Sequence, residues 1–362
     1  MTIDKNRLIF WATLGFVVLF ALLSIYFLKP EIEGDTPSYL DAISVLNGAQ
    51  TPPNFSPNRI LTTFGALESV ILFTNIFGSI FEVWLFLNLI FYFIVSFAFY
   101  FLVRKIFNST QVAFLATLFL ASNYALLDFG LTYLMDIGGW AFYTLSLLFT
   151  YRYIESGNYK NLLWAGMAIG IGGLFKEYAF LACIPIAVIV VYEYWQRPLV
   201  LIKKAILPAL FTLLPIVLVY AYVFKNFDYS YLDWLSFNKS YYVYDSRIIE
   251  YIKSLGSLYN FLAFLLFGGL YCALRFGKEI MADKKTRIFI MGVFLSILPI
   301  LFWPAITQRI LFITVPAGIL LASFLFKKYE KYWWDFLPIL ALYAISNLAM
   351  DTFILPNLNL PF

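Results

Sequence analysis

Long apolar runs separated by short polar segments recur from one end of the chain to the other. Most of the runs are about twenty residues long, which lets a helix cross a hydrocarbon layer of about 30 Å. They predict transmembrane helices near 8–28, 81–103, 112–127, 137–154, 162–175, 179–195, 205–224, 258–275, 288–303, 310–326 and 334–350. The pattern therefore predicts an all-α, polytopic membrane protein with about eleven spans.

The composition agrees with this class. Apolar residues make up 62% of the chain and charged residues only 13%, too few to cover a soluble domain of this size. The first run is too long for a signal-peptide core and has no small-residue cleavage site after it, so we expect it to remain as a span. Histidine is absent, so acid–base chemistry must depend on carboxylates, Lys or Tyr. Cys183 and Cys272 both lie inside apolar runs and are expected to be buried thiols.

The basic residues set the orientation, because Lys and Arg collect on the cytoplasmic side. One side of the predicted bundle holds Lys5, Arg7, Arg104, Lys105, Arg152, Lys160, Arg197, Lys203, Lys204, Arg275, Lys278, Lys284, Lys285, Arg287, Lys327, Lys328 and Lys331. The other holds only Lys29, Arg59, Lys176, Lys225, Lys239, Arg247, Lys253 and Arg309. This bias predicts a multi-pass plasma-membrane protein with a cytoplasmic N-terminus.

One further segment, 59–81, is apolar enough to be considered as a span. If it crossed the membrane, every later segment would change side, and the basic loop 275–287 would lie outside. We therefore expect it to lie in the outer interface or to be re-entrant, and Glu68 in its middle agrees with that reading.

The chain is predicted to form a single transmembrane domain over 1–362, with two long outer loops at 29–80 and 225–257 and no soluble domain. Any active site must then be built from loop segments and helix ends. The segment 245–256 predicts an amphipathic helix lying flat at the lipid boundary, capped by Asp245 or Ser246 and ended by Gly256.

Carboxylates are enriched on the predicted outer side, although Asp and Glu contribute little to topology. The stretch "KPEIEGDTPSYLDA" (29–42) alone contains Glu31, Glu33, Asp35 and Asp41. Thr36 as cap and Pro37 at the first helical position predict a helix over 37–47, with backbone N–H groups holding the Asp35 carboxylate. These acids either stabilise the helix start or carry chemistry.

Five more charged residues lie on the predicted outer side, and all but the first are at span ends. They are Arg59 after "TPPNFSPN", Asp136 in "YLMDIGGW", Lys176 with Glu177 in "GGLFKEYAF", and Arg309 in "FWPAITQRILF". A charge at membrane depth costs about 2.5–3.5 kcal/mol, which makes such residues functional candidates. The alternative for Lys176 and Glu177 is that they lie at the interface or pair with each other. Cations of this kind suit a phosphate, and carboxylates suit the deprotonation of an attacking hydroxyl.

In their order along the chain these elements resemble the GT-C superfamily of membrane glycosyltransferases, which take a sugar from a polyprenyl-phosphate carrier. The resemblance rests on "GDTPSYLDAISVLNG" after the first span, then a loop Arg, a span-mouth Asp, the Lys–Glu element and a late Arg. It implies a GT-C-like bundle with interfacial helices at 37–47 and 60–78. It also departs from the family in two respects. Many relatives have two adjacent acids in the first loop, whereas Thr36 follows Asp35 here, and relatives often carry a soluble C-terminal domain, which is not expected in this chain.

The resemblance implies that Asp35 is the catalytic base of an inverting transfer. Arg59, Lys176 and Arg309 are expected to contact the carrier phosphate or diphosphate. Asp136 and Glu177 are expected to position the sugar or the acceptor. The other expected substrate-binding residues are Tyr39, Asp41 and Glu33, and Asp41 or Glu33 could share the base role. The expected partners are a polyprenyl-phosphate-linked sugar donor, membrane lipid and an acceptor lipid, glycan or protein, and not nucleic acid. No metal cluster or cofactor is expected, although a loosely held divalent cation at Asp35 and Asp136 stays open.

Two other functions fit the same class of chain. A lipid-linked polysaccharide polymerase would be expected to carry more Arg, and usually His, in its large outer loops. A transporter or lipid-glycan flippase typically has paired halves, broken helices and polar groups at the midplane. Here the charges gather at outer span ends, which favours the glycosyltransferase and leaves the sugar and the acceptor open.

Overall fold

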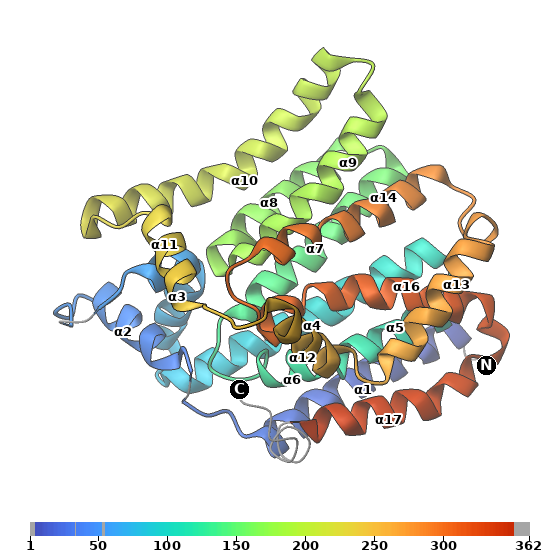
Figure 1. Ribbon diagram of the computed structural model, residues 1–362, viewed down its shortest axis with the longest axis horizontal. Helices are drawn as coiled ribbons and strands as arrows, with labels where there is room; N and C mark the ends of the chain where they lie inside the picture. The colour runs from blue at the N-terminus through green and yellow to red at the C-terminus, as the bar shows by residue number, and fades with distance from the viewer. Residues whose placement is uncertain (1–3, 33, 53–54, 351–362) are drawn as a thin grey trace.

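The computed structural model describes residues 4–32, 34–52 and 55–350, and these residues form helices and connecting loops. Figure 1 shows a bundle in which most long helices run side by side. The α-helices are α1 (Lys5–Leu28), α2 (Thr36–Leu46), α3 (Asn58–Phe77), α4 (Ile80–Phe107), α5 (Thr110–Ala121), α6 (Tyr124–Asp128), α7 (Asp136–Ser156), α8 (Tyr159–Phe175), α9 (Cys183–Tyr194), α10 (Pro198–Phe227), α11 (Tyr231–Tyr241), α12 (Arg247–Tyr259), α13 (Leu262–Ile280), α14 (Lys284–Leu295), α15 (Gln308–Leu311), α16 (Thr314–Lys328) and α17 (Leu337–Leu348). Three 3₁₀ segments, η1 (Glu177–Ala182), η2 (Leu298–Phe302) and η3 (Glu330–Phe336), connect or extend them.

The all-α fold is confirmed, but the helices are more broken than the apolar runs suggest. Every predicted span coincides with helical structure, yet the run 112–127 is split into α5 and α6, and 310–326 into α15 and α16. Among the described residues six helical segments are long and apolar enough to cross a membrane, or seven if α12 and α13, which meet at 90°, count as one. The six are 5–28, 58–77, 80–107, 177–194, 198–227 and 284–302.

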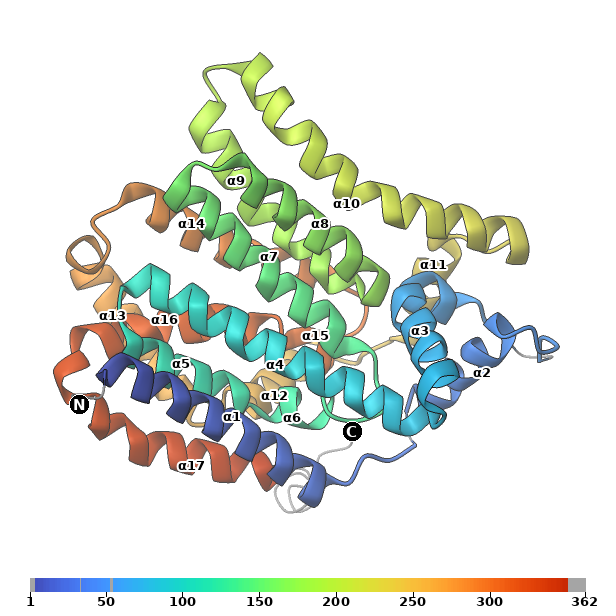
Figure 2. The same ribbon diagram turned by 180° about the vertical axis from the view of Figure 1, so that it is seen from behind.

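The segment expected at the interface, 59–81, forms α3 and the start of α4, and α3 is one of these six segments by length and composition. In Figure 2, α1 and α4 extend across the picture, whereas α3 is strongly foreshortened and stands beside α2 at one end of the bundle. The helix therefore runs at a steep angle to α1 and α4. It is also kinked at Thr63, whose backbone is non-helical (φ −140°, ψ 27°).

Close packing of α7 against the end of α8 depends on two glycines. A Cβ atom on Gly139 would lie 2.6 Å from the Lys176 Cβ, and one on Gly138 would press into the Phe175 side chain. Carbon atoms do not approach so closely, so only glycine lets these helices meet here. This contact fixes the backbone of Lys176 at the end of α8.

Three helices of the two long segments predicted to be outer loops, α2, α3 and α11, lie together at the end of the bundle away from the N-terminus (Figures 1 and 2). The amphipathic helix predicted over 245–256 is confirmed as α12. It continues past Gly256 to Tyr259, and Ser246 at its start makes no capping bond with its side chain. Arg247 Nη1 donates to the Pro304 carbonyl (3.1 Å), which ties α12 to the loop before α15.

Candidate active site

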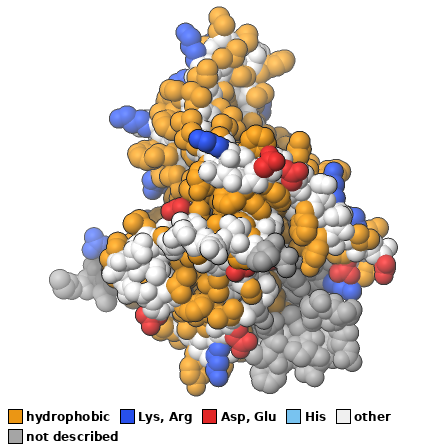
Figure 3. Space-filling model, turned by 90° about the vertical axis from the view of Figure 1, so that its left-hand side faces the viewer, with side chains coloured by type: hydrophobic (Ala, Val, Ile, Leu, Met, Phe, Trp, Pro, Cys, Tyr) orange, Lys and Arg blue, Asp and Glu red, His pale blue; other side chains and the backbone are white. Residues whose placement is uncertain are grey.

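A cavity of about 390 Å³ opens at this end of the bundle, between the first outer loop, α11 and the loop before α15. Figure 3 looks onto this end, where hydrophobic side chains cover much of the surface and a few acidic side chains lie among them. The charged residues that line the cavity are Asp35, Asp41, Arg59, Lys176, Glu177 and Arg309. Residues from four separate parts of the chain therefore meet in one chamber.

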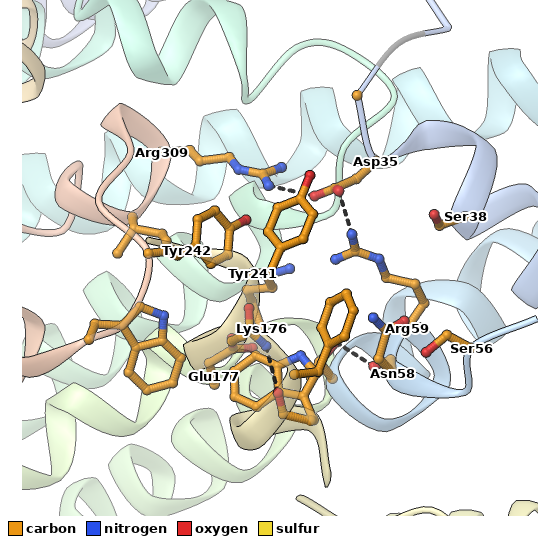
Figure 4. Close-up of a pocket in the computed structure, with 18 of the residues that line it drawn as sticks. Asp35, Ser38, Ser56, Asn58, Arg59, Lys176, Glu177, Tyr241, Tyr242 and Arg309 are labelled. Atoms are coloured by element: carbon orange, nitrogen blue, oxygen red, sulfur yellow. Dashed lines mark hydrogen bonds and ion pairs between the residues drawn. The ribbon is translucent and has the colours of Figure 1, made fainter. Parts of the chain in front are cut away.

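Asp35 lies between two guanidinium groups (Figure 4). One carboxylate oxygen forms an ion pair with Arg59 and the other with Arg309. Asp35 occupies the cap position of α2 but makes no capping bond with its side chain. The expectation that backbone N–H groups hold this carboxylate, with Thr36 as the cap, is therefore wrong, because the arginines offer charged donors that compete with the helix start.

The Thr36 hydroxyl has a different role. It donates to the Tyr133 carbonyl (3.0 Å), so the start of α2 is fastened to the segment that precedes α7. The same segment is held from α4, where Trp84 Nε1 and Asn88 Nδ2 both donate to the Leu134 carbonyl (3.1 and 2.9 Å). These bonds place Asp136, two residues later, at the back of the cavity.

Asp136 is fully buried, and two groups contact its carboxylate. The Tyr178 hydroxyl donates to Oδ1 (2.9 Å), and Arg309 Nη1 lies 3.7 Å from Oδ2, which accepts no hydrogen bond. Arg309 thus stands between Asp136 and Asp35, and a guanidinium occupies the position where a cation would bridge the two carboxylates. A buried carboxylate needs such compensation, since an isolated charge away from water is strongly unfavourable.

Tyr39 supports the cationic side of the cavity from behind. Its side chain is fully buried, its hydroxyl accepts a hydrogen bond from Lys176 Nζ (3.2 Å), and its ring lies 5.0 Å from the Arg59 guanidinium. The ring packs edge-on against Trp84 (5.9 Å), so its position is fixed by α4. Tyr39 therefore positions two cations and does not itself line the cavity.

Lys176 and Glu177 follow each other in the chain but do not pair. Lys176 is 5% exposed and bonds to Tyr39. The Oε2 atom of Glu177 is buried and accepts no hydrogen bond, although the residue lines the cavity. The alternative of a direct ion pair between these two side chains is therefore wrong, and Glu177 remains at the cavity wall.

The electrostatics keep Asp35 ionised. Burial by itself would raise the pKa of Asp35, but the charges of Arg309, Arg59 and Lys176 outweigh burial and lower that pKa from 3.8 to about 2. A carboxyl group in this state is an anion over the whole physiological range. It is also a weak base while both arginines hold it.

The structure brings most of the expected site residues together. Asp35, Asp41, Arg59, Lys176, Glu177 and Arg309 line the cavity, with Asp41 exposed, while Tyr39 and Asp136 lie directly behind it. Glu33 lies outside the described residues.

Sequence reasoning missed two groups of residues. Tyr178 was not singled out, although it follows Glu177 directly. The wall opposite Asp35 is aromatic and is built from Trp234, Phe237, Tyr241, Tyr242 and Trp303. Aromatic residues such as those of 229–244 are common at the lipid boundary, and nothing in their spacing shows that α11 folds back over the segment 29–80.

The comparisons with known proteins concern the fold. Residues 70–222 match the family described as dolichyl-phosphate-mannose-protein mannosyltransferase. The fold resembles the oligosaccharyltransferase of Archaeoglobus fulgidus, with a TM-score of 0.60 and 15% identity over 92% of this chain. The fold is GT-C-like. It also resembles the arabinosyltransferase EmbB of Mycobacterium smegmatis, with a TM-score of 0.58 and 15% identity over 90% of this chain.

The GT-C-like fold expected from the first-loop motif is thereby confirmed. The chain spans 52% of the length of the oligosaccharyltransferase and 31% of that of the arabinosyltransferase. No curated protein matches the sequence.

Proposed function

We propose that the protein is an integral-membrane glycosyltransferase that moves a sugar from a polyprenyl-phosphate carrier to an acceptor hydroxyl, with inversion at the anomeric carbon. One observation carries the proposal. In the cavity at the end of the helix bundle, the Asp35 carboxylate lies among three cations, which are Arg59, Lys176 and Arg309. A lipid phosphate and a hydroxyl group are the partners that these charges fit.

The cations act on the donor. Arg59 and Arg309 can hold the phosphate through paired hydrogen bonds, and Lys176 adds a third positive charge. When the bond between the anomeric carbon and the phosphate oxygen breaks, the phosphodiester anion becomes a phosphomonoester dianion. The cations stabilise the charge that develops on this leaving group, which is the general mode of electrostatic catalysis.

The carboxylates act on the sugar and the acceptor. Asp35 accepts the proton of the acceptor hydroxyl while the new glycosidic bond forms on the opposite face of the sugar from the phosphate. A single displacement with one base inverts the configuration, and the proton on Asp35 then passes to water. Glu177 lines the cavity and can accept a hydrogen bond from a hydroxyl of the transferred sugar. Asp41 is exposed at the same cavity, where it can contact the acceptor.

We further propose that all eleven apolar segments cross the plasma membrane, with the N-terminus in the cytoplasm and the site facing outside. The N-terminus and the outer-loop helices lie at opposite ends of the bundle, which supports this orientation (Figure 1). The steep angle of α3 to α1 and α4 supports its placement in the outer interface (Figure 2). The orientation can be tested with single cysteines introduced at Ser38 and Ser156 and a membrane-impermeant thiol reagent added from outside. The proposal predicts labelling at position 38 only. Labelling at position 156 only would show the opposite orientation.

The test is a donor panel. Purified protein in lipid nanodiscs is incubated with polyprenyl-phosphate-linked hexoses and pentoses and with short glycan or lipid acceptors, and release of polyprenyl phosphate and the anomeric configuration of the product are followed by NMR. The proposal predicts phosphate release with one donor class and an inverted product. Retention of configuration would contradict the single displacement, and consumption of none of the donors would contradict the reaction.

A further inference from the structure

The ion pairs of Asp35 engage the two kinds of group that the proposed reaction needs, which are the carboxylate that acts as base and the guanidinium groups that bind the phosphate. Each of its oxygens is bound to a guanidinium, and the same two guanidinium groups are the ones placed to hold the carrier phosphate. In this arrangement a donor phosphate competes with Asp35 for the same two guanidinium groups, and each Asp35 oxygen that could take a proton from the acceptor already accepts from an arginine. The closed triad of Arg59, Asp35 and Arg309 therefore opposes the binding of both substrates.

The surroundings of the triad favour its opening. The side chains are 17–20% exposed and border the cavity, so a phosphate reaching them from the lipid headgroup level meets the arginines directly. Arg309 keeps a second anionic neighbour in Asp136 at 3.7 Å, and Arg59 keeps contact with the Tyr39 ring at 5.0 Å. Each arginine is thus held in place from behind when its bond to Asp35 is given up, and the Nε of Arg59 has no partner in the closed triad.

We propose that the carrier phosphate exchanges with Asp35 for these two arginines, so that donor binding itself releases the catalytic base. This inference rests on the proposed function and adds an order of events to it. The donor binds first and takes the guanidinium groups, and Asp35, now free, turns to the acceptor hydroxyl. After transfer, Asp35 recovers the arginines and displaces the polyprenyl phosphate product.

The exchange has two chemical consequences. Asp35 becomes a stronger base once it has separated from the two arginines and lies beside the carrier phosphate. The positive charges that held its pKa near 2 are then neutralised by the phosphate. The base is also inactive without donor. Competition between two anions for the same cations further weakens the binding of the product phosphate, which promotes its release.

The experiment measures binding and not turnover. The affinity of polyprenyl phosphate for the purified protein in nanodiscs is compared between wild type, Asp35→Asn and Asp41→Asn, with polyprenol as the uncharged reference. Asp41 is a matched control because it lines the same cavity and carries the same charge, but it is exposed and forms no ion pair among the described residues.

The exchange predicts that Asp35→Asn binds polyprenyl phosphate roughly tenfold more tightly than wild type, equivalent to about 1.4 kcal/mol, with a much smaller change for Asp41→Asn. Equal or weaker binding by Asp35→Asn would overturn the exchange and make Asp35 an organiser of the arginines. Failure of the proposed function looks different, since wild type would then bind polyprenyl phosphate no better than polyprenol.

Folding is controlled with a second variant and melting temperatures. Asp35→Ala also removes the charge without placing an amide against the arginines, and it is expected to bind more tightly than wild type as well. If both variants fail to fold, the exchange is overturned too, because a carboxylate that the fold requires cannot give up its partners in each cycle.

Discussion

Replacing Tyr178 by Phe tests whether the back of the cavity is organised as described. The substitution removes one hydroxyl, which donates to Asp136 Oδ1 at 2.9 Å, and leaves the ring in place. Asp136 is fully buried and its other oxygen accepts no hydrogen bond, so Arg309 at 3.7 Å would be its remaining compensation. Phe at this position therefore removes the one hydrogen bond that a buried carboxylate accepts from a side chain.

A hydrogen bond to a charged group contributes about 1.5–3 kcal/mol, and about 2 kcal/mol is the expected loss of stability here. We expect Arg309 to move toward Asp136 to compensate, which weakens its contact with Asp35 and the phosphate. Transfer by Tyr178→Phe should then fall roughly tenfold, the equivalent of about 1.4 kcal/mol.

Tyr92→Phe is the matched control. Tyr92 is also fully buried and does not line the cavity, but its hydroxyl contacts only neutral acceptors, the carbonyls of Ala121 (2.9 Å) and Val17 (3.4 Å). A neutral hydrogen bond contributes about 1 kcal/mol, so this variant should lose less stability and keep its activity. The two variants are compared by thermal unfolding in detergent and by the initial rate of transfer. Equal loss of stability in both, with unchanged transfer by Tyr178→Phe, would refute the reasoning.

Three further predictions follow from the same contacts. Lys176→Gln should lower the affinity for polyprenyl phosphate by at least about fivefold through loss of a buried charge, whereas Lys160→Gln, at the opposite end of the bundle, should leave it unchanged in the same binding assay. Gly139→Val should fail to give folded protein or should lower the free energy of unfolding by about 3 kcal/mol or more. A Cβ atom at position 139 would lie only 2.6 Å from the Lys176 Cβ, so the valine side chain would overlap it. A normal melting temperature would contradict this packing. Asp35, with its pKa lowered from 3.8 to about 2, contributes about 2 kcal/mol of stability that is complete above its unfolded pKa and is lost as the pH falls through about 2. Wild type should therefore lose its stability advantage over Asp35→Asn in unfolding measurements between about pH 5 and pH 2, and parallel curves would exclude this contribution.

The sequence was sufficient for the class of fold because the apolar runs are long and the charges are few. It was less informative on where helices break. The break between α5 and α6 lies at Ser122 and Asn123, and Asn123 Nδ2 donates to the Leu258 carbonyl of a distant helix (2.9 Å). A tertiary contact of this kind leaves no periodic signal in the local sequence.

For the site, charged residues in an apolar chain were the decisive signal, since membrane depth makes each of them costly. Asp35, Arg59, Lys176, Glu177 and Arg309 were all indicated in this way, and the structure places them around one cavity. Their pairing was not predictable. Local rules assigned Asp35 to the helix start, whereas its partners come from positions 24 and 274 residues away.

The aromatic wall shows the other limit of the sequence. Tyr and Trp in an outer loop are expected at the lipid boundary, and that expectation does not distinguish a side chain facing lipid from one facing a cavity. Trp234 packs 5.5 Å from Trp303, which lies in a different loop. Only the folding of α11 over the first outer loop creates this wall.

The measurement that tests the central claim most directly is sugar transfer from the active donor by wild type, Asp35→Asn and Asp228→Asn at matched thermal stability. Asp228 is the control because it is exposed at the end of α10 and does not line the cavity. If Asp35 is the base, Asp35→Asn should lose about a hundredfold or more of the transfer rate, the usual contribution of general-base catalysis, while it still binds the carrier phosphate and Asp228→Asn stays active. Transfer at the wild-type rate by a stable Asp35→Asn protein would contradict the account and require the base to lie elsewhere.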